Sequence, residues 1–488
     1  MSPSCAIIAR MLRRTKIVAT LGPASDDEKT LCKMIDAGLD VARLNFSHGD
    51  AADHRRRAEL LRAAAESCGR EVGIMGDLQG PKIRIRRFED HSVALVDGED
   101  FFLDSSPKFP DGDQNGVGVA LDTLHTDVSP GDILLLNDGL ITLKVDSITG
   151  TRIHTTIVNG GILSDHKGIN LKGGGLSAAA LTDIDKENIK LAADMDLDFL
   201  AVSFVRNGED VEEARRLFHE AGGHGLIVAK VERTEAVANI NAIIDASDVI
   251  MVARGDLGVE MGYAELTGIQ KKLIRKTRRA NKIVITATQM MESMINNPIP
   301  TRAEVSDVSN AVIDGTDAVM LSGETAVGDY PVAAVREMAA VAVGAEKYPV
   351  PYGASSHRMQ EHFDLVDEAI AMATMYMANH MSVKAIIALT ESGSTTRWMS
   401  RIRSDIPIYA FTPHVSTSRR VAMYRGVHPV PFAIDINNPR GLYQDIFDTL
   451  LANNLVEVDD FAILTKGDLD GVSGSTNSMT VIKIKSSS

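Results

Sequence analysis

Short apolar runs rich in β-branched residues recur along the chain, each followed by polar or glycine-rich residues and then by a stretch of helical periodicity. This alternation is typical of repeated βα units. Eight such runs remain when the segment between Gly80 and Ser177 is set aside: Lys16–Leu21, Val41–Phe46, Val72–Met75, Phe199–Phe204, Leu226–Val231, Val249–Ala253, Lys282–Ala287 and Ala318–Leu321. Eight βα units predict a (β/α)8 TIM barrel.

The segment that interrupts these units has a different pattern. KIRIRRF, SVALV, ILLLND, ITLKVDSI and RIHTTIV alternate or run apolar over strand lengths, and DG, PGD, TG and NGG turns separate them. We therefore predict an all-β domain over residues 81–176, a β-barrel inserted after the third barrel strand as a lid above the catalytic face. The barrel itself is predicted at 1–80 and 177–349. The Gly173-Gly174-Gly175 run that closes the insert is expected to serve as a hinge.

A third domain is predicted over residues 350–488. YPVPYG at Tyr348–Gly353 breaks the helical pattern and indicates a linker. Beyond it, a helix over Asp367–His380 precedes a strand at Ala385–Thr390, and IPIYAF, VHPVPF and FAILT then alternate with helical stretches. This order favours an open α/β sheet.

Composition and charge narrow the class of protein. The chain has 488 residues, 44% hydrophobic and 24% charged, which is typical of a soluble globular protein. A formal net charge of −15 argues against a nucleic acid or an anionic membrane as partner, because either requires a basic face. Cys5, Cys32 and Cys68 have neither paired nor metal-ligand spacing, and we find no signal peptide or membrane span, so we expect a cytoplasmic protein.

Polar side chains follow almost every predicted barrel strand. Catalytic residues of such barrels stand at the carboxyl ends of the strands, so these side chains are expected to meet at one rim. They are Gly22–Pro23, Arg43 with the NFSHG run, Asp77, Lys230 with Glu232, Arg254-Gly255-Asp256, Thr286-Ala287-Thr288-Gln289 and Ser322-Gly323-Glu324. A purely structural barrel has no reason to gather cations, carboxylates and hydroxyls there.

Within this set, Glu232 and Asp256 can offer two oxygens to a hard dication such as Mg²⁺, with water and substrate phosphate as further ligands. Period-two spacing places Lys230 on the same side of its strand as Glu232. Simpler interpretations stay open: a solvated Lys-Glu pair, a helix N-cap for Asp256, and a structural ion pair for Arg43, whose guanidinium also suits a phosphoryl group. His48 alone indicates little more than a loop hydrogen bond.

Familiar nucleotide-binding signatures are missing. No Gly-Lys dipeptide occurs, which excludes a Walker A loop, and no GxGxxG opens a βα unit. In the third domain, the Thr390–Thr396 loop (TESGSTT) joins a strand to a helix and offers hydroxyls and a helix N-terminus to a phosphate. An ordinary Ser/Thr-rich helix cap is the alternative.

Several ordered motifs together resemble pyruvate kinases. They are TKIVATLGPAS, ARLNFSHG, AKVERTEAV, VARGDLGVE, ITATQMMESM, NPIPTRAEVSDVSNAVIDGTDAVMLSGETAVGDYP and the closing GSTNSM. ITATQMMESM with PTRAEVSDV is highly specific to that family, and the match spans nearly the whole chain. The resemblance implies a barrel with an inserted β lid and a C-terminal α/β domain, assembled as a homotetramer.

By motif position, the resemblance also implies roles for individual residues. The reaction is phosphoryl transfer from phosphoenolpyruvate to ADP, giving pyruvate and ATP, with Mg²⁺ or Mn²⁺. The implied phosphoryl and enolate residues are Lys230 and Arg43; the metal ligands are Glu232 and Asp256; the substrate-carboxylate binders are Gly255, Asp256 and Thr288; the nucleotide side comprises Pro23, Asn45, His48, Arg84 and Lys167. Thr288, with water near Ser322 and Glu324, is the candidate proton relay to the enolate.

One departure from the family pattern concerns the monovalent cation. K⁺-requiring members generally have a Glu two residues before the arginine matched by Arg84, where this chain has Lys82. We expect the ammonium of Lys82 to lie beside Asn45, Ser47 and Asp77 and to replace K⁺; a lysine pointing to solvent is the alternative.

The resemblance further implies that the Thr390–Thr396 loop binds an allosteric phosphate through Thr390, Ser392, Ser394, Thr395 and Thr396. Lacking Lys and Arg among its residues, the loop suits a sugar monophosphate or AMP, aided by Arg397 or Arg401. Two rival functions are a Mg²⁺-dependent aldolase on the same barrel and a catalytically silent metabolite sensor.

Overall fold

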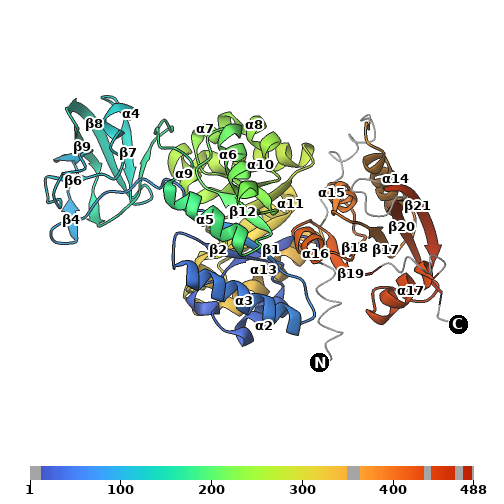
Figure 1. The fold of residues 1–488 in the computed structure, drawn as a ribbon. Helices are drawn as coiled ribbons and strands as arrows, with labels where there is room; N and C mark the ends of the chain where they lie inside the picture. Colours follow the sequence, from blue (N-terminus) through green and yellow to red (C-terminus); the bar gives the residue numbers. More distant parts are fainter. Residues whose placement is uncertain (1–12, 349–362, 434–440, 468–475, 486–488) are drawn as a thin grey trace.

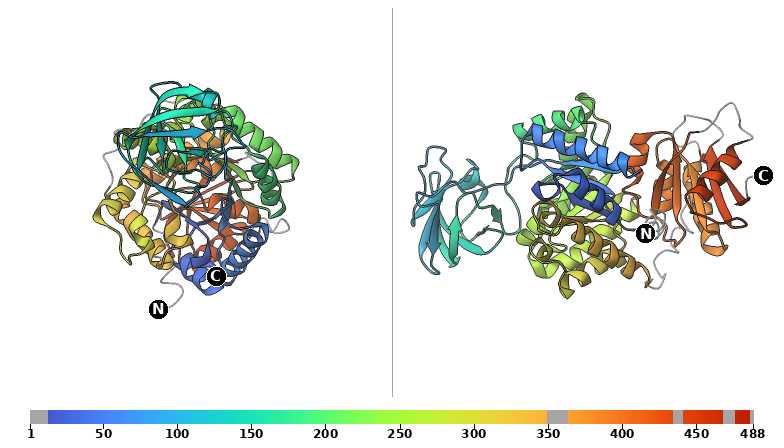
Figure 2. Two further views of the ribbon diagram at one scale, coloured as in Figure 1. Left: turned by 90° about the vertical axis from the view of Figure 1, so that its left-hand side faces the viewer. Right: turned by 90° about the horizontal axis from the view of Figure 1, so that it is seen from below.

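The chain folds into three parts that lie in a row (Figure 1). The computed structural model describes residues 13–348, 363–433, 441–467 and 476–485. A small β domain stands at one end, the barrel lies in the middle and an α/β domain lies at the other end, as Figure 2 shows from a second direction. The predicted linker, from residue 349 on, and Cys5 lie outside the described residues.

The middle part is a closed barrel of parallel strands in the order β1-β16-β15-β14-β13-β12-β3-β2, which confirms the predicted fold class. Each predicted run contributes one strand. They are β1 (Lys16–Thr20), β2 (Val41–Asn45), β3 (Gly73–Asp77), β12 (Phe199–Val202), β13 (Leu226–Val231), β14 (Val249–Ala253), β15 (Ile283–Ala287) and β16 (Ala318–Leu321).

Helices between the strands form the outer layer of the barrel. They are α2 (Glu28–Ala37), α3 (Ala51–Ser67), α5 (Asp183–Asp194), α6 (Gly208–Glu220), α7 (Thr234–Ala238), α8 (Ile240–Ala246), α9 (Arg254–Met261), α10 (Tyr263–Arg279), α11 (Arg302–Asp314), α12 (Gly323–Ala326) and α13 (Pro331–Glu346), with 3₁₀ turns η1 (Pro23–Ser25) and η2 (Glu292–Ile295). Side-chain caps begin several of them; Thr301 and Glu304 form a reciprocal capping box at α11.

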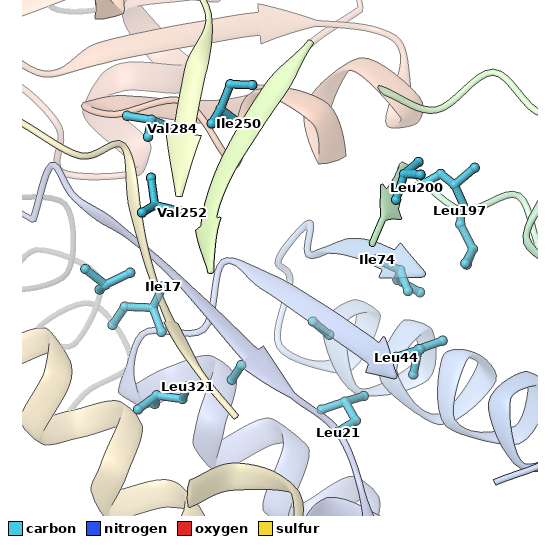
Figure 3. Close-up of a cluster of buried hydrophobic side chains, with 14 of the residues drawn as sticks. Ile17, Leu21, Leu44, Ile74, Leu197, Leu200, Ile250, Val252, Val284 and Leu321 are labelled. Carbon is cyan, nitrogen blue, oxygen red and sulfur yellow. The ribbon is translucent and has the colours of Figure 1, made fainter. Parts of the chain in front are cut away.

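Side chains along each barrel strand point alternately outward and inward, and they form two separate hydrophobic layers. Ile17, Leu44 and Val252 point outward and pack with helix side chains in one cluster, part of which Figure 3 shows. Their neighbours, such as Val18 and Met251, belong to a second cluster that fills the barrel interior and continues into the C-terminal domain. The barrel and the C-terminal domain therefore share a core, whereas the β domain has its own.

The inserted domain is all-β except for the short helix α4 (Leu124–Asp127). Its strands are β4 (Ser92–Leu95), β5 (Asp100–Asp104), β6 (Gly116–Gly118), β7 (Ile133–Leu136), β8 (Ile141–Thr149), β9 (Arg152–Asn159), β10 (Gly161–Ser164) and β11 (Ile169–Leu171). They form a six-stranded mixed sheet and a two-stranded sheet rather than one closed barrel. KIRIRRF, predicted as a strand, makes only isolated bridges, because this segment crosses from one domain to the other.

The C-terminal domain has a five-stranded sheet in the order β19-β18-β17-β20-β21. Its elements are α14 (Val366–His380), β17 (Ala385–Leu389), α15 (Ser394–Ser400), β18 (Ile408–Thr412), α16 (Val415–Val421), β19 (Val427–Pro431), α17 (Leu442–Ala452), β20 (Phe461–Gly467) and β21 (Thr476–Lys483). Strand β21, which pairs antiparallel with β20, was not predicted because polar residues interrupt its sequence. Among the described residues, no helix is long and apolar enough to cross a membrane.

Candidate active site

The inward-facing positions of the barrel strands change from apolar to polar toward the lid. On β2, Val41 belongs to the interior core, and Arg43 follows two residues later. On β13, Val228 is likewise succeeded by Lys230. Because the side-chain period of a strand is two, these polar groups rise from the top of the core into the barrel mouth. Asp77, at the end of β3, joins them.

Asp77 is the centre of this cluster. Arg43 Nε donates to Asp77 Oδ2 at 2.6 Å, and Lys230 Nζ lies 3.1 Å from Asp77 Oδ1. Arg43 Nη1 also donates to Thr20 Oγ1 at 3.0 Å, and Lys230 Nζ donates to Ser203 Oγ at 2.6 Å. The structural ion pair left open for Arg43 is therefore present, and it points the guanidinium across the mouth of the barrel.

Burial and ion pairing fix the charges of this cluster. Burial alone would lower the pKa of Lys230, but Asp77 and Glu232 outweigh it, and the pKa is raised. Burial would likewise raise the pKa of Asp77, yet Arg43 and Lys230 bring it below its ordinary value. The cluster thus holds a protonated ammonium, a guanidinium and a carboxylate that are largely buried from solvent.

Glu232 and Asp256 form a carboxylate pair beside Lys230. Glu232 Oε1 lies 3.1 Å from Lys230 Nζ, and Oε2 accepts the Phe204 N–H at 2.8 Å. Burial raises the pKa of Glu232, and the charge of Asp256 raises it further. A buried and a half-buried carboxylate that repel each other fit a hard dication with substrate and water as remaining ligands. No group of three or more potential metal ligands occurs within the described residues, so the pair could not hold an ion alone.

The N-cap alternative for Asp256 is wrong. Helix α9 has Ala253 as its N-cap, and no side chain caps it. Asp256 lies in the first turn instead, where its carboxylate stays available.

Lys82 lies elsewhere than predicted. Its Nζ donates to Asp256 Oδ1 at 3.1 Å and lies 3.8 Å from Asp138 Oδ1 on the lid. The structure records these two contacts and none to Asn45, Ser47 or Asp77, so the expected neighbours are corrected. Asp77 is already neutralised by Arg43 and Lys230, which leaves Asp256 as the acid that needs a cation. A lysine free in solvent is excluded as well.

Thr288 is held in a strained loop after β15. Its φ is 67°, which β-branched residues rarely adopt. Gly255 N–H donates to Thr288 Oγ1 at 2.9 Å, and Arg254 Nη2 donates to the Thr288 carbonyl at 2.7 Å. Arg254 is itself fixed by Asp307 at 2.7 Å. The N-terminus of α9 and the threonine hydroxyl are thereby presented together, which suits a substrate carboxylate.

Glu324 joins the loops after β15 and β16. Its two oxygens accept the N–H groups of Met291 at 3.1 Å and Ser322 at 2.6 Å, and burial raises its pKa. The carboxyl group is therefore committed to the backbone. These two bonds fix the backbone at Ser322 and in the loop that follows Thr288.

The residues expected on the nucleotide side come from two places. Pro23 begins η1 and Asn45 ends β2, with exposed His48 three residues beyond. Arg84 and Lys167 lie at the base of the lid, where Arg84 bridges Gly168 and donates to the His166 carbonyl at 2.9 Å. The structure brings the two basic residues together; no contact joins them to Pro23, Asn45 or His48 in the described structure.

In the C-terminal loop, the hydroxyls already have partners. Thr390 Oγ1 accepts the Gly393 N–H at 2.9 Å, Thr396 donates to the Gly393 carbonyl at 2.8 Å, and Thr395 pairs with Thr476 at 2.6 Å. Ser394 donates to Asp367 Oδ2 at 3.0 Å. Ser392 also has an interaction within the chain. These bonds order the loop, although no side chain caps the N-terminus of α15.

The expected help from Arg401 is wrong. Its guanidinium forms a buried ion pair with Asp317 of the barrel, and both side chains are 1% exposed. Arg397 instead stacks over the Trp398 ring, 5.3 Å from the centroid.

The glycine run at the end of the lid is anchored to the barrel. Gly173, Gly174 and Gly175 all have positive φ, and a Cβ on Gly174 would meet the Glu235 carboxylate at 2.8 Å. Gly175 N–H donates to Glu235, and Gly173 N–H donates to the Glu260 carbonyl at 3.1 Å. The segment that returns from the lid to the barrel is therefore held by contacts with Glu235 and Glu260.

The raised pKa of Glu260 predicts that folding stability depends on pH. Burial raises its pKa to about 7, against 4.5 for an ordinary glutamate. A raised carboxyl pKa gives stability that is fully present below pH 4.5 and is lost as pH rises through about 7. In the wild type we expect the free energy of unfolding to fall by up to about 3 kcal/mol between pH 5 and pH 8 through this group, and Glu260→Gln should abolish that fall. Urea unfolding at the two pH values measures it. Glu265→Gln, at an exposed position of α10, should show the same pH dependence as the wild type. If Glu260→Gln showed it as well, the assignment to Glu260 would be refuted.

Comparison with known proteins agrees with this geometry. The model "Pyruvate kinase, barrel domain" matches residues 12–335, and "Pyruvate kinase, alpha/beta domain" matches residues 368–482. The chain is 52% identical to pyruvate kinase II of Salmonella typhimurium over 482 residues, covering 98% of this chain and 100% of that protein. This chain belongs to the pyruvate kinase family.

Other pyruvate kinases are similar over most of their length. That of Haemophilus influenzae is 55% identical over 427 residues, covering 87% of this chain and 89% of its own. The Geobacillus stearothermophilus enzyme is 42% identical over 475 residues, with 96% and 80% covered. The chain is thus a pyruvate kinase, a phosphotransferase that uses phosphoenolpyruvate, ADP and a divalent metal.

Two further residues of this pyruvate kinase site were missed from the sequence. Ser203, buried at the end of the fourth barrel strand, receives the Lys230 ammonium and donates to the Leu78 carbonyl at 2.7 Å. Thr20 accepts from Arg43. Their place at the ends of predicted strands was the available signal, but hydroxyls there are too common to stand out.

Proposed function

We propose that this enzyme transfers the phosphoryl group of phosphoenolpyruvate to ADP with Mg²⁺ and without K⁺. The observation that carries the proposal is the position of Lys230, buried between Asp77 and Glu232 with Arg43 on the same carboxylate. Two fixed cations at the mouth of a water-poor barrel suit a phosphoryl group that accumulates negative charge during in-line transfer.

Residues of this chain can be assigned to each step of the proposed reaction. Gly255 N–H and Thr288 Oγ, held by Arg254, orient the substrate carboxylate. Arg43 and Lys230 neutralise the transferring phosphoryl group, and Lys230 stays beside the enolate that remains. Glu232 and Asp256 hold the divalent cation, which supplies further neutralisation of phosphate charge when bound. Arg84 and Lys167 at the lid base meet the nucleotide phosphates.

Protonation of the enolate completes the reaction. Thr288 relays the proton through water, because a threonine hydroxyl is too weak an acid to be its source. Ser322 and Glu324, joined to the neighbouring loop, keep this water path in place.

Lys82 supports the proposal of K⁺ independence in a revised form. Its ammonium lies against Asp256 and near Asp138, so a fixed positive charge sits between the metal-binding carboxylate and the lid. A tethered cation there takes the electrostatic role of a bound monovalent ion.

Regulation, assembly and location are part of the same proposal. The Thr390–Thr396 loop, an ordered turn beside the N-terminus of α15, binds the phosphate of a sugar monophosphate or AMP. Exposed apolar side chains at α14, among them Val366 and Tyr376, suit contacts between copies in a homotetramer. An acidic chain without cysteine pairing fits the cytoplasm.

A coupled assay tests the proposed reaction. With phosphoenolpyruvate, ADP and Mg²⁺, lactate dehydrogenase and NADH should report pyruvate formation, with a rate that depends on a sugar monophosphate or AMP. Turnover of an aldol substrate instead, or no turnover, would favour the barrel aldolase or the silent sensor. Replacing Mg²⁺ by Mn²⁺ in the same assay gives the metal preference.

The metal assignment predicts a selective loss. We expect Glu232→Gln and Asp256→Asn to raise the Mg²⁺ concentration needed for half-maximal rate by about 10²-fold, because each removes one of two charged ligands. A Mg²⁺ titration of the initial rate measures this. Asp183→Asn, at an exposed position of α5, should leave the titration unchanged; unaltered Mg²⁺ dependence in both site variants would contradict the assignment.

A further inference from the structure

A small cavity lies between the barrel and the C-terminal domain, away from the active site. Its volume is about 60 Å³, enough for an inorganic phosphate, and its wall is formed by the ends of α10, α11 and α13 together with the loop before β18. Figure 1 shows α11 and α15 at the end of the barrel opposite the lid. Four of its lining residues are arginines: Arg14, Arg278, Arg403 and Arg425.

The carboxylates near this cavity are already engaged. Arg401 takes both oxygens of the buried Asp317. Glu346 lies between Arg14, at 3.6 Å, and Arg425, at 3.7 Å. Burial would raise the pKa of Glu346, but Arg425 and the bonds from Arg14 and Thr15 keep it below its ordinary value, so it is ionised.

Arg278 and Arg403 are left without acidic partners. Arg278 makes one hydrogen bond, to the Arg401 carbonyl at 3.3 Å, and Arg403 makes one, to the Ile313 carbonyl at 2.9 Å. Neither has a carboxylate within ion-pair distance in the part of the chain that the structure describes. Burial and the neighbouring charge of Arg401 together lower the pKa of Arg278 to about 9, although Asp317 acts in the opposite direction. Two guanidinium groups therefore line the cavity without an ion-pair partner of their own among the described residues.

We propose that this cavity binds a phosphate-sized dianion, the phosphoryl group of a small metabolite, between Arg278 and Arg403. Two unmatched guanidinium groups balance the two charges of a phosphoryl group, and their forked donors suit its tetrahedral oxygens. Arg278 belongs to the barrel and Arg403 to the C-terminal domain, so the bound anion ties the two domains together. The site does not depend on the role proposed for the Thr390–Thr396 loop, which lies at the other end of α15.

Inorganic phosphate is a sufficient probe of this site. Thermal unfolding of the full chain is measured in sodium phosphate and in sodium chloride of equal ionic strength. We expect phosphate to raise the midpoint of the wild type by about 2 °C or more beyond its effect on Arg278→Gln. Arg279→Gln, which removes an exposed arginine from the next position of α10, should respond like the wild type. Phosphate bound at the active site contributes equally to all variants and cancels in the comparison.

Two further variants keep the test decisive. Arg403→Gln should lose the same phosphate response from the other side of the cavity, and Arg278→Lys should keep part of it if Arg278→Gln does not fold. In chloride, Arg278→Gln should be at least as stable as the wild type, because it removes a half-buried charge that has no ion-pair partner in the described part of the chain. An equal phosphate response in the wild type, Arg278→Gln and Arg403→Gln would overturn the proposal.

Discussion

Lys230→Met should reduce kcat for pyruvate formation by at least about 10²–10³-fold while the protein still binds Mg²⁺. The ammonium lies 3.1 Å from both Asp77 and Glu232. In the proposed mechanism it is the group that meets the charge of the phosphoryl and enolate oxygens. A methionine keeps the length of the side chain but removes its charge. Steady-state kinetics with saturating phosphoenolpyruvate and ADP measure the loss.

This variant should also lose stability. Asp77 keeps Arg43, but Glu232 loses its only cationic neighbour in ion-pair distance among the described residues, and a buried carboxylate without a partner costs about 3–5 kcal/mol. Urea unfolding separates this effect from catalysis. Lys271→Met, which removes an ammonium paired with Asp314 on the surface of the barrel, serves as the matched control and should retain wild-type kcat. A kcat within tenfold of the wild type in Lys230→Met would contradict its assigned role.

Lys82→Glu should convert the enzyme from K⁺-independent to K⁺-dependent. In tetramethylammonium buffer we expect the wild type to reach an initial rate within about twofold of its rate in KCl. The rate of the variant should be lower by about 10²-fold or more without KCl than with it. The reason is that the substitution replaces an ammonium 3.1 Å from Asp256 by a second carboxylate, so a mobile cation must restore the balance. Initial rates across a KCl titration measure the effect.

The control for this experiment is Lys172→Glu. Lys172 is an exposed lysine at the base of the lid, so its replacement changes the net charge equally without touching Asp256. Its rate should not respond to KCl. A wild-type enzyme that KCl stimulates strongly, or a Lys82→Glu variant that remains insensitive, would show that Lys82 is not the internal cation.

Much of the fold could be predicted because the barrel repeats one simple pattern. Each βα unit carries an apolar strand of about five residues, and all eight appear at the predicted places. The period of two also placed Lys230 and Glu232 on one side of their strand, as the structure shows. Two segments were misjudged. Strand β21 was not predicted because polar residues interrupt its sequence, and KIRIRRF alternates like a strand but makes only isolated bridges.

The partners of individual charges were harder to predict. Motif position singled out Lys82 as a candidate internal cation but did not predict which carboxylate its ammonium contacts. That contact depends on Asp77 being neutralised by Arg43 and Lys230. Arg401 was assigned to a phosphate loop on sequence proximity, whereas Asp317, 84 positions away, holds it. Such pairs are set by how domains pack, and sequence separation carries no information on that.

The most direct test of the account is to follow the phosphoryl group itself in potassium-free buffer. ³¹P NMR of the purified enzyme with phosphoenolpyruvate, ADP and Mg²⁺ should show one ATP formed for each phosphoenolpyruvate consumed, at a rate that added KCl leaves unchanged within about twofold. Release of inorganic phosphate in place of ATP, or formation of ATP only after KCl is added, would contradict it.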